Sequence, residues 1–528
     1  MNDGTMQDFP LTLDKILDHA AKWHPDTEIV TARDDRPSDR VNYRGLKSRA
    51  LKTSHVLGEL GVTLGQRVAT LAWNTQAHME AWYAIMGMGA ICHTLNPRLT
   101  PQHLGPMIRQ SEARIIIASA DLLPLARQIA GLAPGVERIL AIDGPVESGS
   151  GGNIPISALA PLMERAVEST KWGGFDERTP CGLCFTSGST GAPKGVSYTH
   201  RSSFLHTLRL LQADVLGLTS ADAVLPVVPL FHASAWGLPF AVPAVGAKLV
   251  MPGRHLDGAS LARLIRAENV TIAVGVPTVW LGLFEHLDAT GDTLPSLRRI
   301  IVGGAPMPPA LMERIENELG AVVQTSWGMT EISPVGTVGV LSDPDRRAAI
   351  SGRPALGVDL MLSDEHGVPL RDQREVEGKL HVRGGAVIDR YFGQDEPATD
   401  SQGWFDTGDL ARIDHRGNLT ITGRAKDLIK SGGEWINPAE IEAAICTLPQ
   451  VSLAAVIGRK DQKWGERPIL LVELRDDNHI SDRELLAPLQ DRVASWWIPD
   501  DVVRLKNMPL AATGKIDKIR LRQLYGSN

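Results

Sequence analysis

Strand-like and helix-like segments alternate along the first two thirds of the chain, and this alternation limits the fold to a small set. A β-rich run at 68–72 precedes a helix predicted over 76–88, and another strand is predicted at 115–118. The pattern returns downstream, where a strand at 271–274 precedes a helix that starts near Pro277. Alternating β and α units form a mainly parallel sheet covered by helices. Ligands bind such sheets beyond the carboxyl ends of the strands.

Three polar loops directly follow predicted strands. They are 186–195, the Gly303-Gly304 pair, and 327–331. Because the carboxyl ends of parallel strands meet at one edge of a sheet, we expect these loops to gather on one rim around a common site.

The remainder of the chain has a different character. A chain of 528 residues is too long for a single core, so at least two domains are expected. Short strands separated by Gly, Asp and Asn predict a small β subdomain over about 346–424. The last hundred or so residues are long enough for a compact α+β unit.

Net charge and cysteine spacing argue against a nucleic-acid-binding protein and against a zinc site. The net charge of −7 disfavours a nucleic-acid partner, which usually requires a basic surface. Cys181 and Cys184 form a C-x-x-C, but no second pair completes a zinc site, and we interpret both as buried strand residues. Low cysteine usage fits a reducing compartment.

The sequence predicts a cytoplasmic protein without a membrane span. Its first residues show no cationic segment followed by an apolar run, so no signal peptide is expected. The most apolar stretch, 223–250, is interrupted by four prolines and contains His232. We interpret it as buried strands and loops near a pocket.

The segment 186–195 has the chemistry of a loop that holds a polyphosphate. Glycine allows backbone N–H groups to approach an anion closely, hydroxyls donate to phosphate oxygens, and lysine supplies a positive charge. The candidate residues are Thr186, Ser187, Gly188, Ser189, Thr190, Gly191 and Lys194. The segment is not a Walker A loop, because Lys194 follows proline and precedes glycine. A flexible Gly/Ser turn is the alternative.

Four further motifs follow the phosphate loop in a fixed order. They are Trp327-Gly-Met-Thr-Glu331, Trp404-Phe-Asp-Thr-Gly-Asp409, Gly423-Arg-Ala-Lys-Asp running into Ile429-Lys-Ser-Gly-Gly-Glu434, and Thr513-Gly-Lys-Ile-Asp-Lys518. Together the five motifs resemble those of the adenylate-forming superfamily, which contains acyl-CoA synthetases, peptide-synthetase adenylation domains and luciferases. The resemblance covers nearly the whole chain and is most secure over about 180–518.

The resemblance implies an α/β fold of two domains. A large N-terminal AMP-binding domain over 1–424 would hold parallel, helix-covered sheets and the small β subdomain. A hinge over 425–427, centred on Lys426, would join it to a small, mobile α+β C-terminal domain over 428–528.

The resemblance also implies an ATP site with Mg²⁺. Thr186–Lys194 would hold the β- and γ-phosphates, Trp327 would stack on adenine, Thr330 would donate to the α-phosphate, and Glu331 would bind Mg²⁺. The family usually has tyrosine at the position of Trp327. Asp409 would bind the ribose hydroxyls. The other implied nucleotide contacts are Gly304, Ala305, Pro306, Ser326, Gly328, Met329 and Arg424.

Lys515 is the residue expected to assist the chemical step, together with Lys194, Thr330 and Glu331. In the family the matching lysine comes from the mobile domain and neutralises charge at the α-phosphate. Coenzyme A would then reach the acyl adenylate after the C-terminal domain rotates. The residues implied to line its channel are Lys430, Ser431, Gly432, Gly433, Glu434 and Trp435.

The acid is expected to be apolar. Amino-acid adenylation domains commonly carry Asp at the position of His232, and a buried ammonium group would need such a partner. The stretch Phe231–Pro239 resembles bacterial fatty-acyl-CoA synthetases and 3-methylmercaptopropionate–CoA ligases. Candidate pocket residues are His232, Trp236, Val302, Gly303, Trp327 and Met329. A buried histidine without a role in binding is the alternative for His232.

The expected activity is therefore an ATP-dependent, AMP-forming carboxylic acid–CoA ligase for a fatty or other apolar acid. An aryl acid or a short thioether acid is the next alternative. A ligase that loads a carrier protein and a luciferase-like oxygenase are alternatives of other classes. ATP, the acid and CoA are the expected partners, and a homodimer is possible because many relatives form one.

Overall fold

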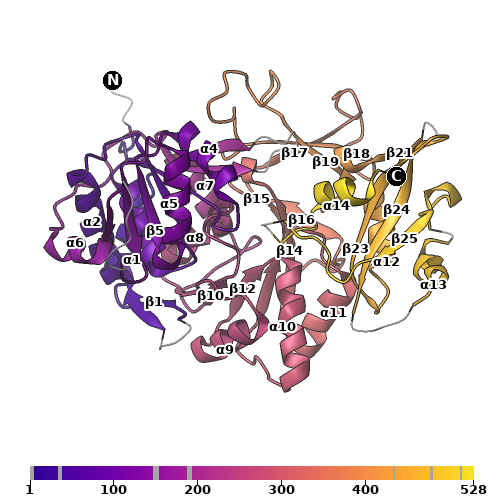
Figure 1. Cartoon of the computed structure of the whole chain (residues 1–528), viewed down its shortest axis with the longest axis horizontal. Coiled ribbons are helices and arrows are strands. Elements are labelled where there is room, and N and C mark those ends of the chain that lie inside the picture. Colours follow the sequence, from indigo (N-terminus) through magenta and orange to yellow (C-terminus); the bar gives the residue numbers. More distant parts are fainter. Residues whose placement is uncertain are drawn as a thin grey trace.

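The protein is described here by a computed structural model that covers residues 5–33, 38–146, 154–186, 193–431, 434–475, 480–490, 492–511 and 514–527. Its described strands form three sheets. Two of these belong to the N-terminal part, and the third belongs to the C-terminal domain at the right of Figure 1.

The first sheet has the strand order β7-β6-β5-β3-β4-β8-β9 in the described residues. Its pairings are parallel except for the hairpin of β8 and β9. The bounds are β3 Arg67–Leu71, β4 Ile91–Thr94, β5 Ile115–Ser119, β6 Arg138–Ile142, β7 Ile156–Ala158, β8 Pro180–Thr186 and β9 Lys194–Thr199.

Helices cover both faces of this sheet because its strands are apolar on both sides. Ile116 and Ile139 pack against α4 and α5, whereas Ile115, Ile117 and Leu140 belong to the core on the opposite face. The helical bounds in this part of the chain are α1 Asp14–Trp23, α2 Tyr43–Glu59, α3 Gln76–Gly87, α4 Pro101–Ser111, η1 Ala120–Leu122, α5 Leu123–Leu132, α6 Leu159–Arg165, α7 His200–Leu210, η2 Ala233–Gly237 and α8 Leu238–Ala244.

The second sheet joins the predicted parallel unit to the predicted β subdomain. Its order among the described strands is β17-β18-β19-β20-β16-β15-β14-β13-β12-β10-β11-β1-β2. The strands from β1 to β14 along this order pair in parallel, and pairing becomes antiparallel from β15 onward and at the edge strand β2.

The bounds of these strands are β1 Glu28–Thr31, β2 Asp39–Asn42, β10 Ala223–Pro226, β11 Lys248–Met251, β12 Ile272–Gly275, β13 Arg299–Val302, β14 Val322–Gly328, β15 Val335–Val338, β16 Ile350–Pro354, β17 Asp359–Ser363, β18 Glu377–Arg383, β19 Phe405–Ile413 and β20 Leu419–Arg424. The accompanying helices are α9 Gly258–Glu268, α10 Pro277–Thr290, α11 Pro309–Glu318 and η3 Thr330–Ile332. The apolar stretch 223–250 forms β10, η2, α8 and the start of β11. Its strands were predicted, but the helix α8 was not, because Pro239 lies in the first turn of α8, where proline is tolerated. None of the described helices is long and apolar enough to cross a membrane.

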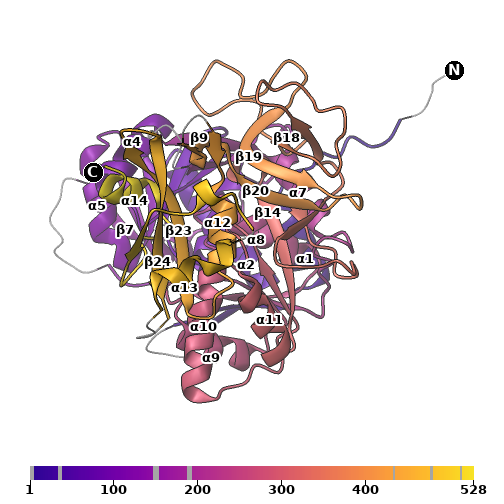
Figure 2. The same cartoon turned by 90° about the vertical axis from the view of Figure 1, so that its right-hand side faces the viewer.

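The C-terminal domain has its own apolar core around two long paired strands, β23 and β24. Helix α12 packs on one face of this pair through Ile441, and α14 packs on the other through Leu521. Figure 2 shows the two helices on either side of β23. The bounds are η4 Ala425–Asp427, β21 Ile429–Ser431, β22 Glu434–Ile436, α12 Pro438–Ile445, β23 Val451–Asp461, β24 Gly465–Leu474, α13 Asp482–Leu486, η5 Ala487–Leu489, η6 Ser495–Trp497, β25 Asp501–Arg504 and α14 Lys518–Tyr525.

Both cysteines of the C-x-x-C lie in β8 and are buried, as expected for strand residues. Neither is in a disulfide. Burial raises the pKa of the Cys181 thiol to about 12, so this side chain stays protonated at neutral pH.

Candidate active site

Asp409 is a buried carboxylate that joins separate parts of the N-terminal domain. It lies on β19 directly opposite Arg424 of β20, whose Nε is 2.7 Å from Asp409 Oδ1. Trp327, at the end of β14, donates its indole N–H to Asp409 Oδ2 over 2.9 Å. Burial raises the pKa of Asp409, and the Arg424 charge and the Trp327 hydrogen bond oppose this rise.

The indole of Trp327 packs directly against the backbone of the neighbouring strand at a glycine. A Cβ at Gly336 of β15 would lie 2.7 Å from Trp327 Cζ3, so only glycine leaves room for the indole. The ring is buried, with 8% of its surface exposed. The indole thus has a fixed position, and its N–H is committed to Asp409.

Glu331 and Thr330 lie next to Trp327, in the short helix η3. Both are buried. Tyr198 of β9 donates its hydroxyl to the Thr330 carbonyl over 2.9 Å, and Tyr391 donates its hydroxyl to Glu331 Oε1 over 3.0 Å. The Tyr198 bond therefore ties the predicted phosphate loop of the first sheet to the motif at the end of β14.

The phosphate loop itself lies largely outside the described residues. The segment 187–192 lies outside the described residues, and it contains Ser187, Gly188, Ser189, Thr190 and Gly191. The two ends of the loop, Thr186 and Lys194, pair with each other across the β8–β9 hairpin. Lys194 Nζ lies 4.7 Å from the centre of the Tyr391 ring.

Lys515 of the C-terminal domain reaches this same region. Its Cε lies 3.6 Å from the position that a Cβ on Gly304 would occupy. The preceding Gly514, with φ of 80°, packs against Val276 and Thr278 at the start of α10. Burial and then the Arg424 charge lower the pKa of Lys515, while the carboxylates of Asp409 and Glu331 act in the opposite direction.

The loop after β13 passes beside Trp236. A Cβ on Gly303 would lie 3.0 Å from Trp236 Cη2, and one on Gly304 would lie 3.9 Å from Cζ2. Ser326 donates its hydroxyl to the Val302 carbonyl over 3.0 Å, which joins the ends of β13 and β14. The predicted pocket residues Trp236 and Gly303 are therefore brought together, close to Lys515. The side chain of Val302, also predicted for the pocket, is instead buried in the core beneath α10 and α11.

Trp236 is presented by an unusual left-handed turn. Residues 233–236 have φ values of 45°, 53°, 45° and 56°, and Gly237 follows with 77°. Non-glycine residues rarely adopt this region, at a cost of about 1–2 kcal/mol each. The turn ends against His206, because a Cβ on Gly237 would lie 2.7 Å from the His206 ring.

His232 lies immediately before this turn and is neutral at physiological pH. Burial, assisted by the positive charge of Lys515, lowers the pKa of His232 to about 4. The assignment of His232 to the acyl pocket stays a prediction.

Some predicted residues lie at the margin of this cluster. Pro306 is exposed and Ala305 is half-buried in the loop after β13. Gly328 approaches the Pro334 carbonyl so closely that a Cβ there would overlap it. Met329 is half-buried and packs against the main core.

The predicted CoA loop forms the β21–β22 hairpin of the C-terminal domain. Gly432 and Gly433 lie outside the described residues, and Glu434 is exposed. Lys430 Nζ lies 5.3 Å from the Trp435 ring, half of which is exposed, and buried Ser431 accepts a hydrogen bond from Arg467 of β24. These contacts attach the hairpin to its own sheet and not to the Asp409 cluster.

The predicted hinge residue Lys426 is exposed in η4, between β20 and β21. The neighbouring Asp427 accepts a hydrogen bond from Arg522 of α14 over 2.8 Å. Lys518, also in α14, binds buried Glu442 of α12 over 2.7 Å. The segment that carries Lys515 is therefore fastened both to the residue after Lys426 and to the domain core.

Lys194, a described residue of the first polar loop, is connected through Tyr391 to Glu331, but the strands before these loops belong to two sheets and not to one rim. β8 belongs to the first sheet, whereas β13 and β14 belong to the second. Periodicity along the chain identifies strands but does not reveal which sheet each one joins. Side chains bridge the two sheets instead, with Tyr198 and Tyr391 as the connections.

Sequence reasoning missed these two tyrosines. Tyr198 occupies an ordinary buried strand position, and nothing in the local pattern distinguishes it. Tyr391 stands in a polar stretch between β18 and β19, where Tyr391-Phe392 is an isolated aromatic pair. This aromatic pair was the available signal. Loops lie on the surface and are mostly polar, so a large aromatic side chain in one indicates a specific contact.

Glu331 suits Mg²⁺ bound together with a polyphosphate. No group of three or more His, Cys, Asp or Glu able to hold a metal occurs in the described ranges. Mg²⁺ typically binds through one or two carboxylates plus substrate phosphates, and not through a cage of protein ligands. One buried carboxylate, connected through Tyr391 to Lys194 of the predicted phosphate loop, fits that preference.

Comparison with known proteins agrees with this geometry. The sequence profile of the AMP-binding enzymes matches residues 17–392, and that of the AMP-binding enzyme C-terminal domain matches 440–515. A medium-chain-fatty-acid–CoA ligase of Ectopseudomonas oleovorans is 39% identical over 99% of this chain and 97% of its own length. A 3-methylmercaptopropionyl-CoA ligase of Ruegeria lacuscaerulensis is also 39% identical, over 99% and 98%. The chain belongs to the AMP-binding enzyme family.

Solved structures of AMP-binding enzymes share the fold over nearly the full length. The anthranilate CoA ligase AuaEII, in complex with anthranoyl-AMP, has a TM-score of 0.88 at 26% identity and covers 98% of this chain and 99% of its own. ATP-bound MatB from Rhodopseudomonas palustris has a TM-score of 0.85 at 25% identity, with 98% and 99% covered. The predicted superfamily, the two-domain α/β fold and the class of AMP-forming acyl-CoA ligase are confirmed.

The Trp327–Asp409 bond gives this AMP-binding enzyme a testable property. Trp327→Phe keeps an aromatic face but removes the N–H that fixes Asp409. A hydrogen bond to a buried charged group contributes about 1.5–3 kcal/mol. We therefore expect the dissociation constant for ATP, measured by isothermal titration calorimetry, to rise about tenfold or more.

Trp280→Phe is the matched control. Trp280 is fully buried, and its Nε1 has no hydrogen-bond partner in the described part of the chain, so this variant loses similar volume but no bond. Its ATP affinity should be unchanged. Unchanged ATP affinity in Trp327→Phe would show that the indole N–H does not position Asp409 for the nucleotide.

Proposed function

We propose that this enzyme is a carboxylic acid–CoA ligase that forms an acyl adenylate from a fatty or other apolar acid and ATP. One observation carries the proposal. The ammonium of Lys515, from the C-terminal domain, lies beside Gly304 and within electrostatic reach of Asp409 and Glu331. An ammonium group so placed can neutralise charge where nucleotide and acid would meet.

The first half-reaction joins the acid to AMP. A carboxylate oxygen attacks the α-phosphorus of ATP, the bond to the β-phosphate oxygen breaks, and pyrophosphate leaves. Negative charge increases on the α-phosphate oxygens as the new bond forms. Lys515 would stabilise this charge, Thr330 would donate to the same oxygens, and Lys194 would interact with the departing pyrophosphate.

Asp409 and Trp327 would hold the nucleoside. Asp409 is an acceptor whose carboxylate is already oriented by Trp327 and Arg424, and its remaining lone pairs suit the two ribose hydroxyls. The indole of Trp327 offers a fixed flat face for adenine. Glu331 would hold Mg²⁺, which when bound offsets charge on the phosphates.

The second half-reaction transfers the acyl group to sulfur. The CoA thiolate attacks the acyl carbon, the bond to the AMP oxygen breaks, and AMP leaves with the electron pair. Lys515 occupies the approach to Gly304 in this structure, so the thiol needs another arrangement. Rotation at Lys426 would withdraw Lys515 and bring Lys430–Trp435 to the site.

The lining of the acyl pocket favours an apolar acid. Trp236 and the Gly303 backbone would supply apolar surface, and His232 is neutral there. A medium-chain fatty acid and 3-methylmercaptopropionate are the acids named for the relatives, and an aryl acid is a further alternative. A carrier-protein thiol in place of CoA, or oxidation of the adenylate, would be products of other classes.

A pyrophosphate-release screen over carboxylic acids tests the proposed function. We expect release with medium-chain fatty acids that is accelerated by CoA, together with AMP and acyl-CoA by mass spectrometry. Amino acids should give no release, because a buried ammonium would lack an acidic partner. Acyl transfer to a phosphopantetheinyl carrier but not to CoA, or light or CO₂ from the adenylate, would contradict the assignment.

Lys515→Ala separates the two half-reactions. Loss of the ammonium should slow adenylate formation about 100- to 1,000-fold. The rate of thioester formation from supplied acyl-AMP should remain within a few-fold of the wild-type rate. Lys506→Ala, an exposed lysine of the same domain, is the control and should affect neither. Equal loss of both half-reactions would argue against this division of roles.

Lys426→Pro tests the hinge. Proline fixes φ near −65° and restricts the preceding residue, so rotation at this position is blocked. We expect acyl-CoA formation from supplied acyl-AMP to fall at least tenfold and adenylate formation to change less. Lys426→Ala keeps the backbone free and should leave both rates near normal. A normal thioesterification rate in Lys426→Pro would locate the hinge elsewhere.

A further inference from the structure

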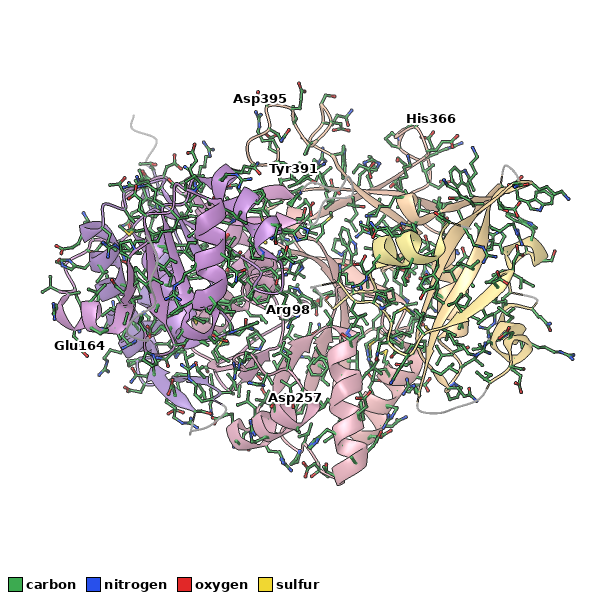
Figure 3. All side chains as sticks on the ribbon, viewed as in Figure 1. Arg98, Glu164, Asp257, His366, Tyr391 and Asp395 are labelled. Carbon is green, nitrogen blue, oxygen red and sulfur yellow. The ribbon has the colours of Figure 1, made fainter. Side chains whose placement is uncertain are left out.

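We propose that Tyr391 is a positioning residue for the metal- and pyrophosphate-binding end of the nucleotide site. This inference rests on the proposed function, since it concerns Glu331 as the carboxylate for Mg²⁺ and Lys194 as the cation for pyrophosphate. Tyr391 contacts both of these side chains, its hydroxyl on one and its ring on the other. Figure 3 labels Tyr391 where the loop after β18 reaches the N-terminal part of the molecule.

The hydroxyl orients Glu331. Tyr391 Oη donates to Glu331 Oε1 over 3.0 Å, and the Ile388 N–H donates to the Glu331 backbone carbonyl over 2.9 Å. With one carboxylate oxygen engaged, the other oxygen and its lone pairs are left for a cation. Groups that hydrogen-bond a ligating carboxylate fix its orientation, and their loss typically weakens metal binding about 10- to 100-fold.

The ring of Tyr391 holds the side chain of Lys194, the first residue of β9. Lys194 Nζ lies 4.7 Å from the ring centre, within the range of a cation–π contact. An ammonium on an aromatic face keeps hydrogens free to donate to phosphate oxygens. The ring therefore restricts a flexible side chain to the neighbourhood where pyrophosphate would be held, without occupying its donors.

The backbone around Tyr391 is fastened on both sides of the site. The Phe392 N–H donates to the Gly195 carbonyl over 2.8 Å, directly after Lys194, and Ser333 donates its hydroxyl to the Ala386 carbonyl over 2.8 Å, directly after η3. A Cβ on Gly195 would lie 2.9 Å from Phe392 Cβ, so the two segments are in close contact. The loop between β18 and β19 thus sets the distance between Lys194 and Glu331.

Two variants separate the hydroxyl from the ring. Tyr391→Phe removes only the hydroxyl, and Tyr391→Leu removes both. The readout is the dissociation constant of ATP, titrated calorimetrically into the full-length protein without any carboxylic acid, in Mg²⁺ and in EDTA. Mn²⁺ binding to the protein–ATP complex, followed by electron paramagnetic resonance, reports the metal directly.

For Tyr391→Phe we expect the Mn²⁺ dissociation constant and the ATP dissociation constant in Mg²⁺ to rise about tenfold or more. The ATP dissociation constant in EDTA should stay within twofold. For Tyr391→Leu the EDTA value should also rise, by about two- to fivefold, because Lys194 loses its aromatic contact.

Two controls exclude a merely structural effect. Tyr43→Phe removes another buried hydroxyl, which donates to the Ala247 carbonyl far along the chain from this loop, and should leave the metal dependence unchanged. In a Glu331→Gln background, Tyr391→Phe should have almost no further effect on Mn²⁺ binding, because the hydroxyl acts through Glu331. If the losses of Mn²⁺ affinity caused by Tyr391→Phe and by Glu331→Gln were additive, Tyr391 would have a general structural role and the inference would be overturned.

The remaining outcomes are distinct. A Tyr391→Phe protein that binds Mn²⁺ and ATP like the unchanged protein would overturn the positioning role and leave the ligase assignment intact. If the wild-type protein binds ATP no better in Mg²⁺ than in EDTA, both the positioning role of Tyr391 and the proposed metal role of Glu331 are overturned.

Discussion

The buried carboxylate of Asp409 is the interaction on which the arrangement of the site depends. Removing a charge from water is costly, and it is tolerated only where partners surround the charge. Here the partners come from separate parts of the chain: Trp327 from the parallel unit, Arg424 from the antiparallel strands, and, through space, Lys515 from the C-terminal domain. The same carboxylate therefore favours both the continuity of the second sheet and the docked position of the C-terminal domain.

Much of this organisation follows from local sequence. The strand predicted at 271–274 is β12, and the helix predicted over 76–88 is α3, because apolar periodicity is strong and turn residues border each element. The candidate site residues were predicted from five motifs, each with polar groups that an apolar core would not contain. The structure brings Trp327, Asp409 and Lys515 together, and the roles of the site residues stay predictions. Domain limits, a cytoplasmic location and a homodimer stay predictions.

The features that the sequence did not reveal are mostly contacts between residues far apart in the chain. Strand periodicity does not specify which sheet a strand joins, so the loops of β8 and β14 were expected on one rim although side chains join them across two sheets. Tyr198 and Tyr391 connect residues more than fifty positions away in the chain. Such contacts depend on tertiary structure, and a single sequence carries little trace of them.

The left-handed turn at 233–236 has a consequence for how the range of acids could change in evolution. Four successive residues held against their intrinsic backbone preference must be retained by what surrounds them, and Trp236 is lodged against Gly303 and Gly304. A smaller residue at 236 would lose these contacts and so leave the strained backbone with less support. Side-chain size at 236 and the backbone conformation of the turn are thus linked, so a lineage that changed the proposed acyl pocket at Trp236 to admit bulkier acids would need compensating changes in the turn itself.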